Sequence, residues 1–401
     1  MTPQKTAEDL DVIVIGAGAA GMMCAIEAGK RGRKALVIDH AKAPGEKIRI
    51  SGGGRCNFTN LHSAPNAFLS QNPRFCISAL SRYTPRDIIA LIERHGIAWH
   101  EKTLGQLFCD DSARLVVDLL VTEMRRAGAR LKLQAAVSQV EKTAVDGFRL
   151  TLDSGETLTA QAVVIATGGK SIPKMGATAF GYDIAAQFDV PVVATRPALV
   201  PLTFEVGLLQ RLRPLVGVAV DARVAAGKTA FEEAMLFTHR GLSGPAILQI
   251  SSYWREGEAI TVDMAPGTDV FAALRGARTT QPKQAPQTAL SAFVPRSLAL
   301  FLAEAEGVAA RNLADCADQV LRRLAAAVNG WTVKPVGSEG YRTAEVTLGG
   351  VDTRALDSRT LETKAVPGLY FIGEVVDVTG WLGGYNFQWA WASGWCAGQV
   401  V

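Results

Sequence analysis

Closely spaced cysteines are missing from this sequence. Its six cysteines, at positions 24, 56, 76, 109, 316 and 396, form no C-x-x-C pair. Structural zinc sites and redox-active dithiols both need thiols close together, so the spacing predicts no metal site and reduced, mostly buried thiols. Cys56 follows a run of glycines but has no partner thiol nearby in the sequence, which favours a packing role for it.

Long apolar runs and clustered basic residues are missing as well. No apolar run reaches the ~18 residues that span a bilayer, and residues 1–10 lack the basic-then-apolar order of a secretion signal. The formal net charge is +4 over 401 residues, and lysines and arginines form no concentrated block. These features predict a cytoplasmic protein with no membrane span and no nucleic-acid partner. They leave the oligomeric state open.

The chain of 401 residues is long enough for more than one hydrophobic core, and 48% of its residues are hydrophobic. Residues 11–15, 34–39, 162–166 and 368–372 have the apolar composition of buried parallel strands, and all but the second end in glycine-bearing turns. Ligands bind at such strand ends in open α/β sheets. Helices are expected after the first turn, to about residue 30, and over 386–397.

The middle of the chain has a different pattern. Residues 190–265 show the short alternation of antiparallel strands, 281–287 form a Gln/Pro-rich exposed connector, and 296–329 carry Leu and Ala at helical spacing. We therefore predict an α/β fold with a discontinuous Rossmann-like domain, residues 1–189 and 341–401. An antiparallel-β plus helical substrate domain, residues 190–340, is expected to be inserted in it.

The first strand is followed by a dinucleotide fingerprint, G-x-G-x-x-G, at Gly16, Gly18 and Gly21. The first glycine permits the tight turn, the second lets backbone approach a pyrophosphate, and the third lets the helix pack on the strand with its N-terminus toward the phosphates. Asp39, at the end of the second strand, is placed to accept hydrogen bonds from a ribose. This fingerprint fits NAD and FAD equally.

Three further segments favour FAD. Residues 45–57 (GEKIRISGGGRCN) stand where a simple NAD domain would continue into a helix, and their three glycines suit backbone lying flat against a large ring. Residues 163–169 (VVIATGG) resemble the A-T-G strand end of FAD-dependent reductases. Residues 368–374 (GLYFIGE) resemble the motif whose acidic residue holds the FAD ribityl chain, although that residue is more often Asp.

At this point the sequence resembles a family of bacterial flavoproteins that includes aminoacetone oxidase and the flavin-dependent reductase of dehydro-bile acids. The resemblance lies in residues 47–60, 237–245 (FTHRGLSGP), 344–351 (AEVTLGGV) and 373–388 (GEVVDVTGWLGGYNFQ). It implies FAD and an inserted substrate domain but no particular substrate. Trp381-Leu382 departs from the smaller or more polar residues usual in the family, which puts transfer of a substrate from any relative in doubt.

The fingerprint, the further segments and the resemblance together predict a set of FAD-binding residues. They are Gly16, Gly18, Ala19, Ala20, Gly21, Asp39, His40, Lys47, Ser51, Gly52, Gly53, Asn57, Val137, Thr167, Gly168, Gly169, Gly373, Glu374, Gly384, Asn386 and Phe387.

Three other residues are candidates for catalysis. His239, in a glycine-bounded turn, is suited to exchange a proton beside a flavin, or alternatively to brace its turn. Arg55 either binds a substrate carboxylate or the flavin pyrimidine edge, or braces the glycine loop. Tyr385 lies at the start of the last helix, whose N-terminus would favour an anionic reduced flavin.

The chain carries no second G-x-G-x-x-G, so NAD(P)H would reduce the flavin only from a transient site, unless the substrate itself supplies electrons. The sequence therefore predicts an FAD-dependent oxidoreductase of a small organic substrate, by amine oxidation or by NAD(P)H-dependent reduction of a conjugated C=C bond. Two alternatives stay open, a flavin-dependent RNA-modifying enzyme and a protein in which FAD is structural.

Overall fold

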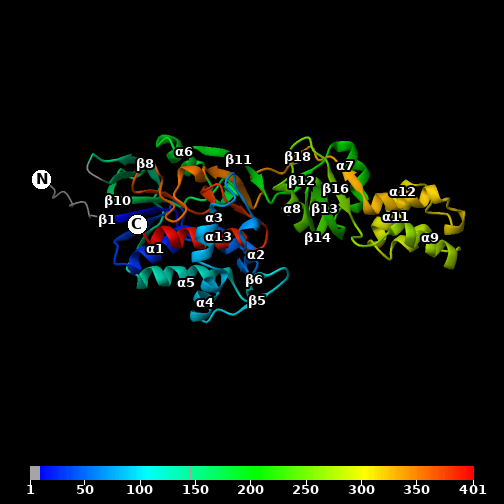
Figure 1. Ribbon diagram of the computed structural model, residues 1–401, viewed down its shortest axis with the longest axis horizontal. Helices are drawn as coiled ribbons and strands as arrows, with labels where there is room; N and C mark the ends of the chain where they lie inside the picture. Colours follow the sequence, from blue (N-terminus) through cyan, green and yellow to red (C-terminus); the bar gives the residue numbers. More distant parts are fainter. Residues whose placement is uncertain (1–9, 145–146) are drawn as a thin grey trace. The chain divides into compact units, whose positions relative to one another are not determined.

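The computed structural model describes residues 10–144 and 147–401. Segment 1–9, from which the absence of a secretion signal is predicted, lies outside the described residues. The chain divides into two compact units, the first running up to Arg196 and resuming at Val346, the second comprising Pro197–Glu345; their elements are labelled in Figure 1. The two domain boundaries predicted from the sequence are at about residues 190 and 340. Among the described residues, no helix has the length and apolarity needed to cross a membrane.

A seven-stranded sheet lies at the centre of the first unit, in the order β7-β2-β1-β10-β9-β8, with β20 also beside β10. Strands β7, β2, β1, β10 and β20 are parallel, whereas β8 and β9 form an antiparallel meander with β10. Strands β1, β2 and β20 and the second half of β10 are apolar at nearly every position because both of their faces are covered, whereas the edge strand β7 is partly charged and exposed. Their bounds are β1 Leu10–Ile15, β2 Ala35–Ile38, β7 Arg130–Lys132, β8 Val137–Lys142, β9 Phe148–Leu152, β10 Thr157–Ile165 and β20 Leu369–Phe371.

The helices of the first unit pack around this sheet. The first and last, α1 and α13, lie side by side although they come from opposite ends of the chain (Figure 1). They approach closely because Gly394 has no side chain; a Cβ there would collide with the carbonyl oxygen of Ala20. The helices are α1 Ala19–Lys30, α2 Glu46–Gly54, α3 Cys76–Arg82, α4 Pro85–Arg94, α5 Ala113–Arg126, α6 Phe180–Gln187 and α13 Tyr385–Gly398.

Shorter elements complete the first unit and the crossings to the second. Strands β3, β5 and β6 form a small antiparallel sheet, and β4 pairs with β21. Their bounds are β3 Asn57–Asn60, β4 Phe68–Leu69, β5 Trp99–Glu101, β6 Gln106–Cys109, β11 Val192–Ala198, β19 Val346–Val351 and β21 Thr379–Gly380, and the 3-10 turns are η1 Pro65–Ala67, η2 Pro173–Met175, η5 Thr353–Ala355 and η6 Gly373–Val375.

The glycine-rich segment after β2 differs in part from the prediction. A helix was not expected there, yet α2 begins at Glu46. Its backbone leaves helical geometry at Ser51, Gly52 and Gly53, and both glycines have a left-handed φ, +57° and +67°. The segment is therefore one helical turn followed by the expected glycine loop, because left-handed φ values favour glycine.

The second unit has its own antiparallel sheet and core. The strand order is β17-β16-β13-β14-β15-β12-β18. β13 alternates between buried and more exposed positions along its length, as a half-buried strand should, and β14 does so over residues 235–238. The bounds are β12 Leu202–Thr203, β13 Ala219–Ala226, β14 Thr229–Thr238, β15 Gly241–Ser243, β16 Ile260–Asp263, β17 Trp331–Val333 and β18 Gly337–Ser338.

Helices α9, α11 and α12 gather beside this sheet (Figure 1). The expected connector at 281–287 is shorter than predicted, because Pro286 starts α10 in the first-turn position that suits proline. The antiparallel-β plus helical composition of the insertion and the Rossmann-like sheet together confirm the predicted fold class. The helical elements are α7 Val206–Leu212, η3 Arg213–Leu215, α8 Pro245–Ser251, α9 Val270–Thr280, α10 Pro286–Leu290, α11 Arg296–Ala305, η4 Leu313–Asp315 and α12 Asp318–Asn329.

Candidate dinucleotide site

The loop between β1 and α1 has the geometry of a phosphate-binding turn. A Cβ on Gly16 would collide with the carbonyl oxygen of Ala166, and one on Gly21 with that of Gly16. A Cβ on Gly18, by contrast, would meet no atom within 4 Å. Gly16 and Gly21 are therefore needed for packing within the protein, whereas Gly18 faces open space at the N-terminus of α1, where Ala19 and Ala20 form the first turn.

Asp39 connects the end of β2 to this loop. Its Oδ2 accepts a hydrogen bond from the Ala17 N–H at 2.6 Å, and its Oδ1 accepts one from the Ala41 N–H at 2.8 Å. A carboxylate has about four lone-pair positions, so each oxygen can still accept from a ribose hydroxyl. The Ala135 N–H donates to the carbonyl oxygen of Asp39, which places the start of β8, with Val137, along the same edge.

The glycine loop after α2 presents backbone and one cation. Gly53 has no atom within 4 Å of its Cβ position, and Arg55 is exposed. Cys56 is fully buried at a φ of +53°. Burial, and next the neighbouring thiol of Cys109, raise the pKa of Cys56. The spacing of the cysteines in the sequence did not indicate that Cys109 lies beside Cys56. Both cysteines are buried and free of disulfides, which supports a packing role for Cys56.

Glu374 is held by charged and polar groups from three other segments of the chain. Its Oε2 accepts from Lys47 Nζ at 2.7 Å, and its Oε1 accepts from Ser171 Oγ at 2.9 Å and from the Thr347 N–H at 3.0 Å. Lys47 also donates to Ser171 Oγ at 2.7 Å. Gly169 packs against this cluster; a Cβ there would touch Glu374 Oε1.

The cluster keeps Glu374 ionised. Burial raises the pKa of Glu374, but the Lys47 ammonium and the hydrogen bonds from Lys47, Ser171 and Thr347 outweigh burial and hold the pKa below its usual range. Nearby, the Thr167 hydroxyl is buried without a hydrogen-bond partner among the described residues. This hydroxyl packs against Gly181 of α6, where a Cβ would collide with it, whereas the backbone of Gly168 lies beside Glu374 at the strand end.

The turn before α13 is shaped by two glycines and by Asn386. Gly384 has a φ of +97°, and a Cβ there would collide with the carbonyl group of Thr59. The Asn386 side chain folds back onto the turn. Its Oδ1 accepts a hydrogen bond from the Gly380 N–H and its Nδ2 donates one to the Gly380 carbonyl, both at 2.9 Å. When the side-chain amide of Asn57 is oriented with its oxygen toward α13, this oxygen accepts a hydrogen bond from the Gly384 N–H at 3.2 Å.

Aromatic rings surround the same turn. Tyr385 is buried and forms edge-to-face contacts with Phe68 and Trp381, at centroid distances of 6.0 Å each. Phe387 stacks on Trp391 at 5.7 Å. The Trp381 side chain therefore belongs to an aromatic wall beside the N-terminus of α13.

The structure does not place all catalytic candidates in one unit. Arg55 and Tyr385 lie in the first unit, whereas His239 lies in the second, exposed in the turn between β14 and β15. The Thr238 hydroxyl accepts from the N–H groups of Arg240 and Gly241 and so fixes this turn without the imidazole.

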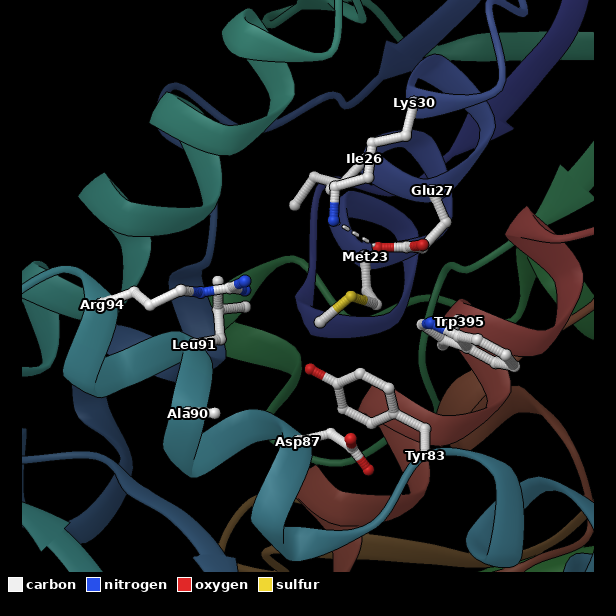
Figure 2. Close-up of a pocket in the computed structure, with 10 residues that line it drawn as sticks. All are labelled: Met23, Ile26, Glu27, Lys30, Tyr83, Asp87, Ala90, Leu91, Arg94 and Trp395. Atoms are coloured by element: carbon white, nitrogen blue, oxygen red, sulfur yellow. Dashed lines mark hydrogen bonds and ion pairs between the residues drawn. The ribbon is translucent and has the colours of Figure 1, made fainter.

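A separate pocket of about 230 Å³ opens between α1, α4 and α13 (Figure 2). The Tyr83 hydroxyl points into it, between Met23 and Arg94, and Trp395 closes one side. None of the predicted cofactor residues lines this pocket, and its volume is below the ~300–1,000 Å³ typical of ligand sites. The strand ends described above therefore stay the candidate dinucleotide site. Among the described residues, no group of three or more His, Cys, Asp or Glu side chains is placed to hold a metal ion.

The residues at these strand ends fit FAD. Gly18 leaves room where a pyrophosphate would lie, Asp39 has acceptor capacity for a ribose, and Glu374 is an ionised acceptor at the end of β20. Comparison with known proteins agrees with this fold: residues 10–400 match the HI0933-like protein Rossmann domain. The chain belongs to this HI0933-like family.

Relatives of this HI0933-like chain cover nearly its whole length. A ribosomal RNA dihydrouridine synthase of Escherichia coli (strain K12) is 52% identical over 393 residues, 98% of each chain. The protein of the same name from Haemophilus influenzae is 46% identical over 385 residues, 95% of this chain and 96% of that one. A 3-dehydro-bile acid delta(4,6)-reductase of Clostridium scindens is 29% identical over 407 residues, 97% of this chain and 98% of that one. The similarity to the bile-acid reductase agrees with the family resemblance that the sequence motifs predict.

Two polar residues of the HI0933-like site were missed in the sequence. Ser171 and Thr347 both bind Glu374, and neither was among the predicted residues. A signal existed for each: Ser171 follows the glycines at the end of β10, and Thr347 lies inside the motif at 344–351. Short hydroxyl side chains are common on surfaces and in turns, so only their positions in these motifs distinguish them.

Proposed function

We propose that this protein is an FAD-dependent reductase that converts uridine in ribosomal RNA to dihydrouridine. The observation that carries the proposal is the identity of 52% and 46%, over nearly full length, to two proteins that bear this activity in their names. The Rossmann-like fold and the strand-end geometry support a dinucleotide cofactor of the FAD type, with FAD rather than NAD favoured by the glycine loop after α2.

The chemistry matches one of the reactions expected from the sequence. The C5=C6 bond of uracil is conjugated to the C4 carbonyl, so its reduction adds a hydride at C6 and a proton at C5. Reduced FAD, when bound, supplies the hydride, and NAD(P)H is the donor we propose for restoring it. Because we find no second fingerprint for a nicotinamide nucleotide, this donor would bind only transiently.

The chain's own residues have distinct parts in this proposal. The Gly16–Gly21 turn and the N-terminus of α1 bind the pyrophosphate, and Asp39 binds the adenosine ribose. Glu374, kept ionised by Lys47, accepts from the ribityl hydroxyls. The N-terminus of α13 provides N–H donors and positive potential for the reduced ring. His40, Val137, Asn57 and Phe387 stay predicted contacts.

Proton delivery is assigned to His239, with Tyr385 as the alternative. His239 is exposed in the turn between β14 and β15, whereas Tyr385 is enclosed by aromatic rings. A solvent-exposed side chain with a transferable proton favours His239 as the general acid in this proposal. Arg55 is proposed to hold a carbonyl or phosphate oxygen beside the glycine loop, since RNA has no carboxylate for it to bind.

A second candidate function is reduction of a conjugated C=C bond in a small molecule. The 29% identity to a dehydro-bile-acid reductase over nearly the whole chain supports it. Both candidates use the same hydride transfer and differ only in what carries the double bond.

Deletion of the gene in its host tests the choice. We expect ribosomal RNA from the deletion strain to lose one or more dihydrouridines, seen by mass spectrometry of nuclease fragments as the loss of two hydrogen atoms' mass at a uridine. A plasmid copy should restore it, and a copy carrying Gly18→Ala should not. Unchanged ribosomal RNA in the deletion strain would rule out the RNA substrate and leave the small-molecule reductase.

A further inference from the structure

Helices α9 to α12 carry a moderate excess of positive charge. Residues 270–329, which contain these helices, hold seven Lys and Arg against four Asp and Glu. Arginines from two of the helices, α9 and α12, form a basic cluster that is not contiguous in the sequence.

Three arginines on these helices surround one carboxylate. Arg278 Nη2 lies 2.6 Å from Asp318 Oδ1, and Arg275 Nε lies 3.7 Å from Oδ2. Arg278, Arg275 and Arg322 together lower the pKa of Asp318, the hydrogen bond from Arg278 most of all. One ionised aspartate cannot neutralise three guanidinium groups, so the group carries a surplus of two positive charges.

Two of these guanidinium groups also flank an aromatic ring. The Arg322 guanidinium carbon lies 4.1 Å from the centroid of Phe271, and that of Arg275 lies 5.7 Å from it. Both arginines are exposed and Phe271 is half-buried. A partly exposed ring beside guanidinium planes is suited to stack on a nucleic-acid base, while guanidinium forks bind phosphate.

The two helices that carry these residues are held in a fixed arrangement. They run antiparallel, since Asn329 at the end of α12 accepts from the Val270 N–H at the start of α9, at 3.2 Å. At the other end, Arg278 Nη1 donates to the Cys316 carbonyl at 2.8 Å. Phe271, Arg275, Arg278 and Arg322 therefore form a preorganised face, called here the α9–α12 face.

We propose that the α9–α12 face docks the phosphate backbone of the ribosomal RNA substrate. This inference rests on the proposed function. RNA is favoured over an acidic protein because the face combines a positive surplus with an aromatic ring suited to stacking, and bases supply a flat ring to pair with it. Because the α9–α12 face belongs to the second unit, RNA docked there would not compete with the cofactor and the reacting base for the binding groups of the first unit.

The salt dependence of RNA binding tests this proposal. Binding of purified, fluorescently labelled ribosomal RNA to the FAD-loaded protein is measured by anisotropy over a range of KCl concentrations. Each phosphate contact contributes about 0.7–0.9 to the slope of log K against log salt. The variant R275Q/R322Q should therefore have a slope less negative by roughly 1.4–1.8, with unchanged FAD content. If this double variant does not fold, R275Q alone should lose about half as much.

A control variant removes the same charge elsewhere in the second unit. R223Q/K228Q changes two exposed residues of the β13–β14 hairpin and should keep the wild-type slope. Equal slopes for wild type and R275Q/R322Q would overturn the proposal, as would equal losses in both variants or no RNA binding by the wild type. Competition by polyglutamate as strong as by RNA would also overturn it in favour of an acidic protein partner.

The same samples separate this inference from the proposed function. If the wild type binds RNA through the α9–α12 face but forms no dihydrouridine, the reaction is wrong and the docking face stands. If dihydrouridine forms and R275Q/R322Q binds RNA like the wild type, the reaction stands and the docking face is wrong.

Discussion

Lys47 Nζ lies 2.7 Å from Glu374 Oε2, an ion pair that joins α2 to the turn after β20 across 327 residues of sequence. Lys47→Met would leave the Glu374 carboxylate partly buried without its cation. We expect a loss of about 1–3 kcal/mol in stability, since a buried charge then lacks its partner. Thermal unfolding of the FAD-free protein measures this. Lys42→Met, at an exposed position of the preceding loop, should have little effect.

The same pair predicts a pH dependence. The folded pKa of Glu374 is below its ordinary value, so its stabilising contribution is present above the ordinary glutamate range and is lost as the pH falls through the folded pKa. The stability deficit of Lys47→Met should therefore shrink on acidification. A deficit of constant size from neutral pH to pH below that range would show that Lys47 stabilises by packing alone.

Gly18→Ala should separate folding from cofactor binding. The position has a φ of −85° and no atom within 4 Å of a Cβ, so alanine should leave the thermal stability of the FAD-free protein equal or slightly higher. A methyl group facing the pyrophosphate should weaken FAD binding by about 10-fold or more. Gly21→Ala is the contrast, because its Cβ would collide with Gly16 and cost about 1–3 kcal/mol of stability. FAD binding by Gly18→Ala at the wild-type level would place the pyrophosphate elsewhere.

Asp39→Ala should weaken FAD binding by roughly 1.5–3 kcal/mol, the scale of a charge-assisted hydrogen bond. The substitution also removes two hydrogen bonds within the protein, because Asp39 accepts from the Ala17 and Ala41 N–H groups. Asp39→Asn keeps one acceptor oxygen and should lose less. Titration of the apoprotein with FAD, followed by flavin fluorescence, measures both, with Lys42→Ala, at an exposed position three residues on, as the neighbouring control. Equal affinity in all variants would mean that the ribose is held by other residues.

His239→Ala should keep bound FAD with a near-native visible spectrum, because His239 belongs to the second unit. We expect a loss of ~10²-fold or more in turnover, as for a missing general acid. The limb of the pH–rate profile near neutrality should disappear with it. Arg240→Gln, at the next position of the same exposed turn, controls for disturbance of the turn. Unaffected turnover in His239→Ala would move the proton transfer to Tyr385 or water.

Local signals made the Rossmann core predictable. β1, the glycine turn, α1 and β2 are contiguous, and each follows from apolar runs or from a glycine that only one geometry explains, such as Gly16 against Ala166. Lys47 and Glu374 were recognised separately by their motifs, but sequence spacing cannot show that two charges so far apart form a pair. The helical turn at 46–50 was missed because the glycines after it dominate the segment.

Other features depend on tertiary contacts. Asn386 stays a predicted cofactor contact, and its side-chain amide in addition binds the Gly380 backbone, a contact within the folded turn that the sequence does not show. The arginines of the α9–α12 face are dispersed in sequence from 275 to 322 and gather only because two helices run antiparallel. The absence of a basic block in the sequence was therefore a weak argument against nucleic acid.

A single-turnover reaction tests the central claim most directly. The FAD-loaded protein is reduced under anaerobic conditions, freed of reductant, and mixed with ribosomal RNA from the deletion strain, and flavin absorbance and dihydrouridine content are followed together. The proposed function predicts that ribosomal RNA reoxidises the flavin and that one dihydrouridine forms for each flavin reoxidised. Flavin that stays reduced in the presence of this RNA, yet is reoxidised by a small conjugated enone, would contradict it.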